Sequence, residues 1–380
     1  MKRRVCIFAA QFFPHLGGVE RYTYNLSKKL IELGNEVTIV TSNTQQIKVY
    51  ENIEGIEVYR MPCFRLLDGR YPVLKFNSIF KKIHSILRNK CFDLVIVNTR
   101  FYLHSIYGQW FGKTQKIKVI TIDHGSSHLS VDNKILDFCG SIFEHMITKI
   151  GQIFCKEYYG VSHASVNWLK HFHITARGVL YNSVNVEEIE NIRMHQKGKF
   201  RENYEIEDDA IVITFTGRLL PEKGIPQLIS AFKRISQTNK KLYLFLAGDG
   251  PLESFVFKNK CRNIIPLGRL DFNNVIMLLS ESDIFCLPSF SEGFSTSILE
   301  AIACRCFVVT TERGGARETF PTEEYGEVIK NNNVELLLGS LEKVIIEPER
   351  RKKAVELSFK RLIENYTWDI VASKVNKLLN

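Results

Sequence analysis

Short apolar runs alternate with segments of helical periodicity along both halves of the chain. Near the start, the strand-like run RVCIFAAQFF is followed by a Gly-Gly loop and by ERYTYNLSKKLIELG, where Leu26, Leu30 and Leu33 recur at helical spacing. Gly34 follows as a C-terminal cap. EVTIVTS, FDLVIVNT and KVITIDHG are further predicted strands, rich in β-branched residues.

The second half repeats this alternation. AIVITFTG leads through RLLPEKG into the helical pattern IPQLISAFKRIS, and LYLFLAGDG, DIFCLPS and CFVVTT are strands separated by the helix-like NNVIMLLSES and STSILEAIA. Continuous apolar strands that alternate with helices predict parallel sheets covered on both faces, which is an α/β fold.

The length of 380 residues favours two domains rather than one core. Their join is expected between Asn182 and Asp209, where the sequence is polar and forms strands poorly. Two doubly wound domains bind ligands at the carboxyl ends of their strands, so we expect a deep cleft between them to hold the site.

Composition and cysteine usage indicate a folded protein of the cytosol. Hydrophobic residues make up 45% and charged residues 24% of the chain, and no run of about 18 apolar residues is present. The basic and apolar start imitates a signal peptide, but Gln11 and Pro14 interrupt it, so it is interpreted as a first buried strand. The nine cysteines lack the paired spacing of a zinc site and are expected to be reduced.

The positive charge lies in the first half. Residues 1–180 carry 24 Lys and Arg against 13 Asp and Glu, whereas the remainder is almost balanced. This asymmetry favours an anionic membrane or a nucleic acid as partner, or it is simply a soluble basic surface. The basic residues are not interleaved with aromatic ones in a recognisable nucleic-acid module, so we expect no nucleic acid.

The stretch LKFNSIFKKIHSILRNK, residues 74–90, is a candidate interfacial helix. Phe76, Phe80 and Ile83 fall near helical spacing, and lysines and arginines flank them. The pattern fits equally a surface helix whose apolar face joins the core. Periodicity leaves both interpretations open.

The candidate binding residues of the second half are charged side chains that follow predicted strands. Arg218 and Lys223 precede a predicted helix, where two cations and the helix dipole suit a diphosphate; a solvated turn is the alternative. Further on, Glu292 lies in a loop beyond a buried strand, and Glu300 lies on the next helix. Amides at that helix start, with Gly293 allowing close approach, can hold a phosphate or a sugar hydroxyl, and Glu300 can accept bonds from ribose hydroxyls.

The first half offers two weaker candidates. Gly17 and Gly18 lie between a strand and a helix, where the backbone can approach an anionic ligand or simply turn. Asp123, His124 and His128 follow a buried strand, at the end of the sheet where ligands bind.

Taken in order, the segments PHLGGVERY, DHG, GVSHASVNWL, YNSVN, FTGRLLPEKGIPQLISAF, LAGDGPLE, DIFCLPSFSEGFSTSILEAIA and TTERGGARE resemble the retaining glycosyltransferases of family 4. They cover nearly the whole chain. The resemblance implies the GT-B architecture, with an acceptor-binding Rossmann-like domain of residues 1–181 plus about 365–380 and a nucleotide-sugar-binding domain of residues 182–364. YNSVN departs from the commoner N-G-V-D, which weakens inferences about that turn.

The resemblance also implies roles for single residues. Arg218 and Lys223 look like the grips on the pyrophosphate, and Glu300 looks like the ribose-binding carboxylate. Glu292, with the amides near Gly293 and Phe294, looks like the contact to the donor sugar. In the other domain, Gly18 resembles the glycine whose amide approaches the phosphates, and His124 resembles the histidine near the transferred sugar.

The expected reaction moves a sugar from a nucleotide-diphosphate donor to a glycan or lipid-linked acceptor, with retention of configuration implied by the family. We expect cell-surface polysaccharide or lipopolysaccharide synthesis, at the cytoplasmic face of the membrane. No D-x-D motif is present, so Arg218 and Lys223 are expected to replace a metal, and no cofactor is predicted. A nucleotide-sugar epimerase of the same fold is the nearest alternative. A nicotinamide-dependent dehydrogenase is disfavoured because no G-x-G-x-x-G opens the first helix.

Overall fold

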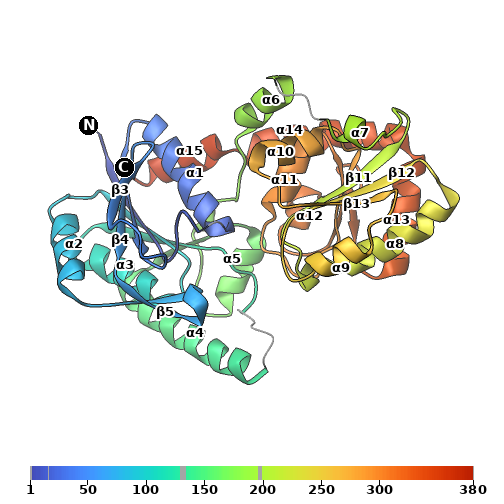
Figure 1. The fold of residues 1–380 in the computed structure, drawn as a ribbon. Coiled ribbons are helices and arrows are strands. Elements are labelled where there is room, and N and C mark those ends of the chain that lie inside the picture. The colour runs from blue at the N-terminus through green and yellow to red at the C-terminus, as the bar shows by residue number, and fades with distance from the viewer. Residues whose placement is uncertain (1, 16, 129–133, 196–198, 380) are drawn as a thin grey trace. The chain divides into compact units, whose positions relative to one another are not determined.

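A computed structural model describes residues 2–15, 17–128, 134–195 and 199–379. The chain divides into two compact units, which Figure 1 shows in colour order along the chain. The N-terminal unit comprises Met1–Asn182 and Trp368–Asn380, and the C-terminal unit comprises Ser183–Thr367. Each unit is built on its own parallel sheet. The cleft expected between them stays a prediction.

The N-terminal unit holds an eight-stranded sheet in the order β10-β9-β8-β7-β1-β2-β4-β3 and a separate hairpin of β5 and β6. Neighbours in the large sheet are parallel except β3 and β4, and Val5 of β1 aligns with Val37 of β2 and Leu94 of β7. The strands are β1 (Arg4–Ala9), β2 (Glu36–Ser42), β3 (Tyr50–Ile53), β4 (Ile56–Met61), β5 (Cys63–Leu66), β6 (Tyr71–Leu74), β7 (Leu94–Asn98), β8 (Lys118–Asp123), β9 (Glu157–Gly160) and β10 (Gly178–Val179).

The helices of this unit are α1 (Gly18–Glu32), α2 (Ser78–Arg88), α3 (Leu103–Thr114), α4 (Lys134–Phe154), α5 (His163–Lys170) and α15 (Trp368–Lys377), with a short 3₁₀ turn at Leu67–Gly69. Gly34 has a φ of +87°, as expected of the residue that ends α1. The C-terminal helix α15 returns to this unit and packs beside α1 (Figure 1).

The C-terminal unit holds a six-stranded sheet in the order β13-β12-β11-β14-β15-β16, parallel throughout. The strands are β11 (Ile211–Thr216), β12 (Leu242–Ala247), β13 (Ile264–Gly268), β14 (Ile284–Leu287), β15 (Phe307–Thr311) and β16 (Glu327–Ile329). Their side chains are largely buried, as the continuous apolar runs predict.

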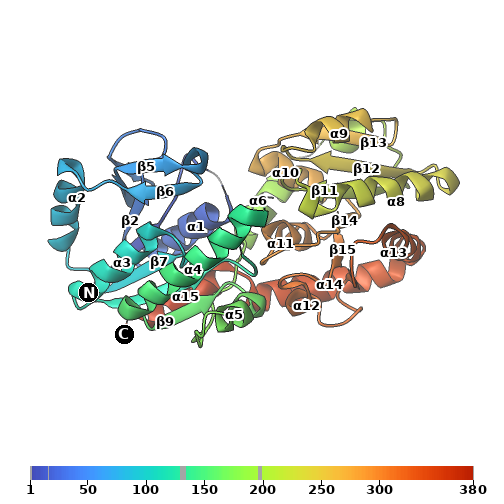
Figure 2. The ribbon, with the colours of Figure 1, turned by 90° about the horizontal axis from the view of Figure 1, so that it is seen from below.

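The helices of this unit are α6 (Val186–His195), α7 (Phe200–Asn203), α8 (Ile225–Thr238), α9 (Glu253–Lys258), α10 (Phe272–Ser280), α11 (Thr296–Ala303), α12 (Ala316–Thr319), α13 (Val334–Ile346) and α14 (Pro348–Asn365), with a 3₁₀ turn at Pro221–Lys223. Helices α8 and α13 pack side by side, and α11 packs beside α14 (Figure 2). The fold is thus the predicted one, with helices around two doubly wound parallel sheets.

The segment 74–90 forms α2, and its apolar face joins the core. Phe80, Ile83 and Leu87 are buried in one cluster with Phe8 of β1, whereas Phe76 remains exposed. The core interpretation therefore holds for these three residues, and membrane contact through Phe76 and the exposed Ile79 stays a prediction. Among the described residues, none of the helices combines the length and apolarity needed to cross a bilayer.

Candidate active site

The two central strands of the C-terminal sheet mark the point where its strand order reverses. The chain runs outward from β11 to β12 and β13, and then returns to place β14 on the other side of β11. Loops that leave the carboxyl ends of such neighbouring strands form the ligand crevice of doubly wound sheets. Here they are the loop of residues 217–224 after β11 and the loop of residues 288–295 after β14.

Lys223 and Glu292 meet across this reversal point. Nζ of Lys223 lies 2.6 Å from Oε1 of Glu292, and both side chains are mostly buried. The hydroxyl of Ser289 donates to the same carboxylate oxygen across 2.8 Å. Two residues predicted from separate motifs therefore form one ion pair, with the carboxylate held from two sides.

Backbone contacts between the two loops bring Lys223 and Glu292 together. The amide of Phe290 donates to the carbonyl of Glu222 across 2.9 Å, which ties the two loops together beside the ion pair. Gly224 has a φ of +71°, and a Cβ there would lie 2.1 Å from the carbonyl oxygen of Pro288. Only glycine permits both this conformation and this close approach.

Arg218 lies in the same loop as Lys223 and is exposed. The next residue, Leu219, is buried, and its amide donates to the carbonyl of Asp249 across 2.7 Å. The GDG turn after β12 therefore supports the Arg218 loop. Gly248 and Gly250 have positive φ, and a Cβ at either position would meet the backbone of Gly217 or Leu219, so both glycines are needed for the close packing of the two loops.

Gly293 and Phe294 are held by the loop after β15. The amide of Gly315 donates to the carbonyl of Gly293 across 3.0 Å. The ring of Phe294 is buried, packs on Gly315 and lies 5.3 Å from the ring of Tyr366. The side chain of Phe294 is thus a packing anchor, so any part it plays in donor binding falls to its backbone.

Helix α11 begins at this loop and carries Glu300. Its N-cap, Ser295, makes no side-chain capping bond to the helix amides and instead shares a hydrogen bond of 2.9 Å with the hydroxyl of Ser297. Amides at the helix start are therefore not taken by the cap side chain. Glu300 is buried on this helix, eight residues beyond Glu292, so both carboxylates belong to the β14–α11 connection.

The candidate glycine of the N-terminal unit opens α1. Gly18 is exposed, and a Cβ there would meet nothing within 4 Å. In the same turn Glu20 is buried, and a Cβ on Gly17 would lie 2.4 Å from its Oε2. A phosphate at this helix start would meet that negative charge, so the role of Gly18 stays a prediction.

His124 follows β8 and is connected to two other elements. Its Nε2 lies 3.3 Å from Oδ1 of Asn98 at the end of β7, and Asn98 in turn donates to the hydroxyl of Thr23 on α1 across 2.6 Å. The ring of Tyr22 meets the imidazole edge-on at 4.8 Å between centroids. Burial lowers the pKa of His124 to about 3, so the imidazole is neutral at physiological pH.

The sequence analysis named Asp123 but missed the buried charge cluster to which it belongs, next to His124. Arg100 is buried after β7, with its Nη1 3.1 Å from Oδ1 of Asp123 and its Nη2 bonded to Glu144 of α4. The guanidinium also lies 3.8 Å from the ring centre of Phe172. Burial, partly opposed by the charge of Arg100, raises the pKa of Asp123 to about 6. A signal existed, because Arg100 directly follows a predicted strand.

The predicted residues therefore fall into two groups. Arg218, Lys223, Glu292 and Glu300, with Gly293 and Phe294, lie on loops and a helix at the carboxyl edge of the C-terminal sheet, and among them Lys223 and Glu292 form an ion pair. Gly18 and His124 lie at the carboxyl edge of the N-terminal sheet. Each group follows the rule that parallel sheets present ligand-binding loops at that edge.

Comparison with known proteins assigns a class to this architecture. The family "Glycosyl transferases group 1" matches residues 196–361, and "Glycosyltransferase Family 4" matches residues 16–188. An uncharacterized glycosyltransferase of Methanocaldococcus jannaschii is 27% identical over 99% of this chain and 98% of its own length. The GPI3 subunit of the phosphatidylinositol N-acetylglucosaminyltransferase of Saccharomyces cerevisiae is 26% identical over 82% of this chain and 68% of its own.

Solved structures agree with the fold. HepE of Anabaena in complex with UDP matches 100% of this chain and 99% of its own length, with a TM-score of 0.73 at 16% identity. The fold is GT-B, a class of glycosyltransferases with two Rossmann-like domains. The chain belongs to glycosyltransferase family 4, as its motifs predict. This assignment places it apart from the nicotinamide-dependent dehydrogenases.

Proposed function

We propose that the protein transfers a sugar from a nucleoside diphosphate donor, foremost a UDP-sugar, to an acceptor at a membrane surface. The observation that carries the donor half is the ion pair of Lys223 and Glu292 at the strand-order reversal of the C-terminal sheet. The solved HepE complexes with UDP and with UDP-glucose support the choice of UDP.

The charges of the site suit the cleavage of a sugar diphosphate. Breaking the bond between the anomeric carbon and the diphosphate leaves negative charge on the phosphate oxygens. Lys223 and Arg218, with the amides at the start of α11, are the groups that would stabilise this charge. Glu292, already oriented by Lys223 and Ser289, would contact the donor sugar, and Glu300 would accept bonds from the ribose.

We infer from the family that the anomeric configuration is retained. We also infer that the diphosphate needs no divalent metal, because two cations on one loop supply the charge that a D-x-D-bound metal would supply. A direct measurement is the transfer rate after passage over chelating resin, with and without added Mg²⁺ or Mn²⁺. Equal rates are expected, and a rate that requires either ion would contradict the inference.

The exposed face of α4 supports an acceptor at a membrane surface. Large apolar side chains recur there every three or four residues and are exposed, namely Phe138, Ile142, Met146, Ile150 and Ile153. An apolar helix face on a basic half of the chain suits contact with anionic lipid. The GPI3 relative is named for a lipid substrate, phosphatidylinositol.

Vesicle flotation tests this surface. We expect the protein to float with vesicles of phosphatidylcholine and phosphatidylglycerol at low salt, and Met146→Glu to float less because a charge enters the apolar face. Ile346→Glu, at an exposed position of α13, is the matched control and should float as the unchanged protein does. No flotation at low salt, or an equal loss in the control, would contradict the membrane half of the proposal.

Thermal stabilisation tests the donor half. UDP and UDP-sugars should raise the Tm more than GDP or ADP, and Lys223→Ala should remove most of that shift. Stabilisation by none of the three nucleotides would exclude this donor class. The epimerase alternative predicts donor turnover without an acceptor, whereas transfer requires one, so turnover with and without added lipid extract separates the two.

A further inference from the structure

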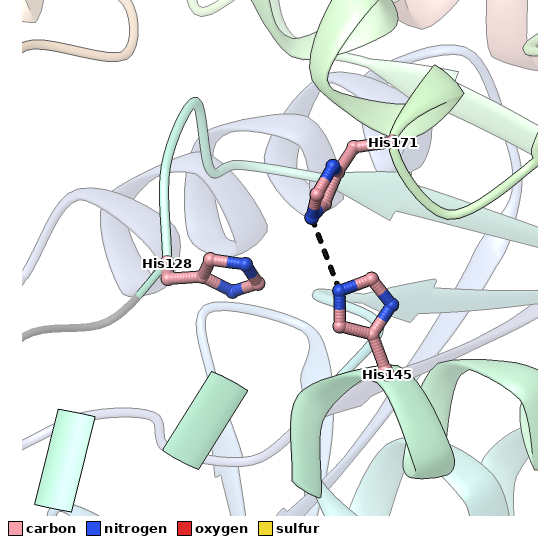
Figure 3. A group of neighbouring side chains, drawn as sticks. All are labelled: His128, His145 and His171. Carbon is pink, nitrogen blue, oxygen red and sulfur yellow. Dashed lines mark hydrogen bonds between the residues drawn. The ribbon is translucent and has the colours of Figure 1, made fainter. Parts of the chain in front are cut away.

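Three histidines from distant parts of the sequence meet in the N-terminal unit. His128 follows β8, His145 lies on α4, and His171 comes directly after α5. One ring nitrogen from each lies within 4.8 Å of the others, and the three rings point toward one another (Figure 3). Their ring centres are 4.7 to 5.5 Å apart.

Two of these rings already share a short contact. Nε2 of His145 lies 3.0 Å from Nε2 of His171. Both side chains are exposed, so both rings are accessible from solvent. The ring of Trp168 stacks on His171 at 4.8 Å and meets His128 edge-on at 4.9 Å. The ring of Phe172 lies 4.7 Å from that of His145, so aromatic packing helps to orient all three imidazoles.

The ring of His128 is oriented by a carboxylate as well. Nδ1 of His128 lies 2.6 Å from Oε2 of Glu144, whose other carboxylate oxygen is bonded to the buried Arg100. A carboxylate that accepts the Nδ1–H of a histidine directs its Nε2 lone pair outward and increases its basicity. This is the arrangement in which histidines commonly bind metals.

We propose that His128, His145 and His171 bind one divalent transition metal ion, with Zn²⁺ as the preferred occupant. Three neutral imidazoles suit zinc, and a fourth position would remain for water or another ligand. Zinc–nitrogen bonds of about 2.0–2.1 Å in a tetrahedral site place the ligand nitrogens roughly 3.4 Å apart. A pair at the upper limit of 4.8 Å would have to close by about 1.4 Å to reach that separation, through rotation of the exposed rings.

The ion would tie together three elements around the loop that carries His124. Glu144 links His128 to Arg100, and Arg100 links Glu144 to Asp123 at the end of β8. Metal binding would therefore fix both ends of the β8 exit, through His128 on one side and Asp123 on the other. The metal ion would serve to hold this loop in place. It would not neutralise the donor diphosphate, which is the role proposed for Arg218 and Lys223.

The spacing of Cys and His along the chain predicts no metal site, and this proposal departs from that expectation. The reason is the fold, because a loop, a helix and a helix end bring the rings together without any recurrent sequence spacing. The two outer ligands, His145 and His171, are exposed, so replacing them is not expected to disturb the core.

The test uses the full chain without a polyhistidine tag and Zn²⁺ as the probe. Competition against a chromophoric chelator should give one zinc per chain, with roughly 100-fold or greater loss of affinity in His145→Gln and in His171→Gln. His195→Gln, at an exposed histidine of the C-terminal unit, is the matched control and should bind as the unchanged protein does. Excess zinc should raise the Tm of the control but not of the two ligand variants.

Substitution by Co²⁺ identifies the ligands. The bound ion should show weak ligand-field bands and no thiolate charge-transfer band, because the proposed set contains nitrogen donors and no cysteine. The absence of zinc binding, equal affinity in His145→Gln and the control, or a thiolate band would each overturn the proposal.

Discussion

The amide of Phe290 donates to the carbonyl of Glu222 across 2.9 Å, and this bond joins the loops that leave β11 and β14. The residue after Glu222 is Lys223, and two residues after Phe290 stands Glu292, so the bond sets the register in which the ion pair forms. The pair thus depends on backbone geometry as much as on charge.

Gly224→Ala tests that geometry. The new Cβ would lie 2.1 Å from the carbonyl oxygen of Pro288, in a left-handed conformation, so we expect a loss of roughly 2–5 kcal/mol in the free energy of unfolding. Gly339→Ala is the control, because a Cβ there meets nothing within 4 Å on helix α13 and should stabilise by about 0.5–1 kcal/mol. Urea unfolding compares the two, and equal effects would refute the argument.

Lys223→Ala should impair transfer through the diphosphate. We expect kcat/KM for the donor to fall on the order of 10²-fold or more, as for the loss of one preorganised charge-stabilising group. Lys233→Ala, on the nearby helix α8, removes a lysine whose Nζ donates to Asn259 in an exposed contact, and it should leave kcat/KM unchanged. Steady-state kinetics decide, and comparable rates in Lys223→Ala and the control would remove Lys223 from the site.

Arg100→Met should destabilise the N-terminal unit. The change leaves the buried carboxylates of Asp123 and Glu144 without their cation, which typically costs about 3–5 kcal/mol. Arg88→Met, on the exposed face of α2, is expected to change stability by less than about 0.5 kcal/mol. The free energy of unfolding of both variants is measured by chemical denaturation. A loss in Arg100→Met as small as that in Arg88→Met would mean that the two carboxyl groups carry no negative charge for Arg100 to neutralise.

Asp123→Asn should change how stability depends on pH. An Asp carboxyl in the unfolded chain titrates near ~3.9, whereas burial raises the pKa of Asp123 in the fold to about 6. Between these values the folded state binds more protons, so the contribution of Asp123 is complete below about pH 4 and is lost as the pH rises toward about 6.

The measurable quantity is the free energy of unfolding of the unchanged protein minus that of Asp123→Asn. It should fall by about 2–3 kcal/mol between about pH 4 and pH 7. Asp123→Asn also loses the contact to Arg100. This loss changes the difference by the same amount at every pH and leaves its dependence on pH unchanged. A difference that stays constant with pH would show that Asp123 does not titrate in this range.

His124 should stay neutral over the physiological range. Its pKa of about 3 lies below the unfolded value near ~6.5, so its contribution to stability is present above about pH 6.5 and is lost as the pH falls below that value. The NMR signal of His124, assigned by its absence in His124→Asn, should not move between about pH 5 and pH 8. A titration with a midpoint in that window would contradict the neutral state.

The sequence determined the fold class and the family. Continuous apolar strands alternating with helices require parallel sheets covered on both sides, and this expectation is confirmed in both units. Motifs such as GRLLPEKG and EGFSTSILE predicted the family, which the comparisons confirm. Periodicity and local chemistry are properties of neighbouring residues, so a sequence displays them directly.

Pairings between distant residues were decided only by the tertiary structure. Periodicity could not tell whether 74–90 faces lipid or core, because an amphipathic helix serves both. Only the tertiary structure shows that Phe80, Ile83 and Leu87 join the core. Lys223 and Glu292 are 69 residues apart, and the strand order brings their loops together. Arg100, His145 and His171 escaped notice, and His128 was named only as part of the loop after a buried strand, because the partners of these residues come from other strands and helices and leave no spacing in the sequence.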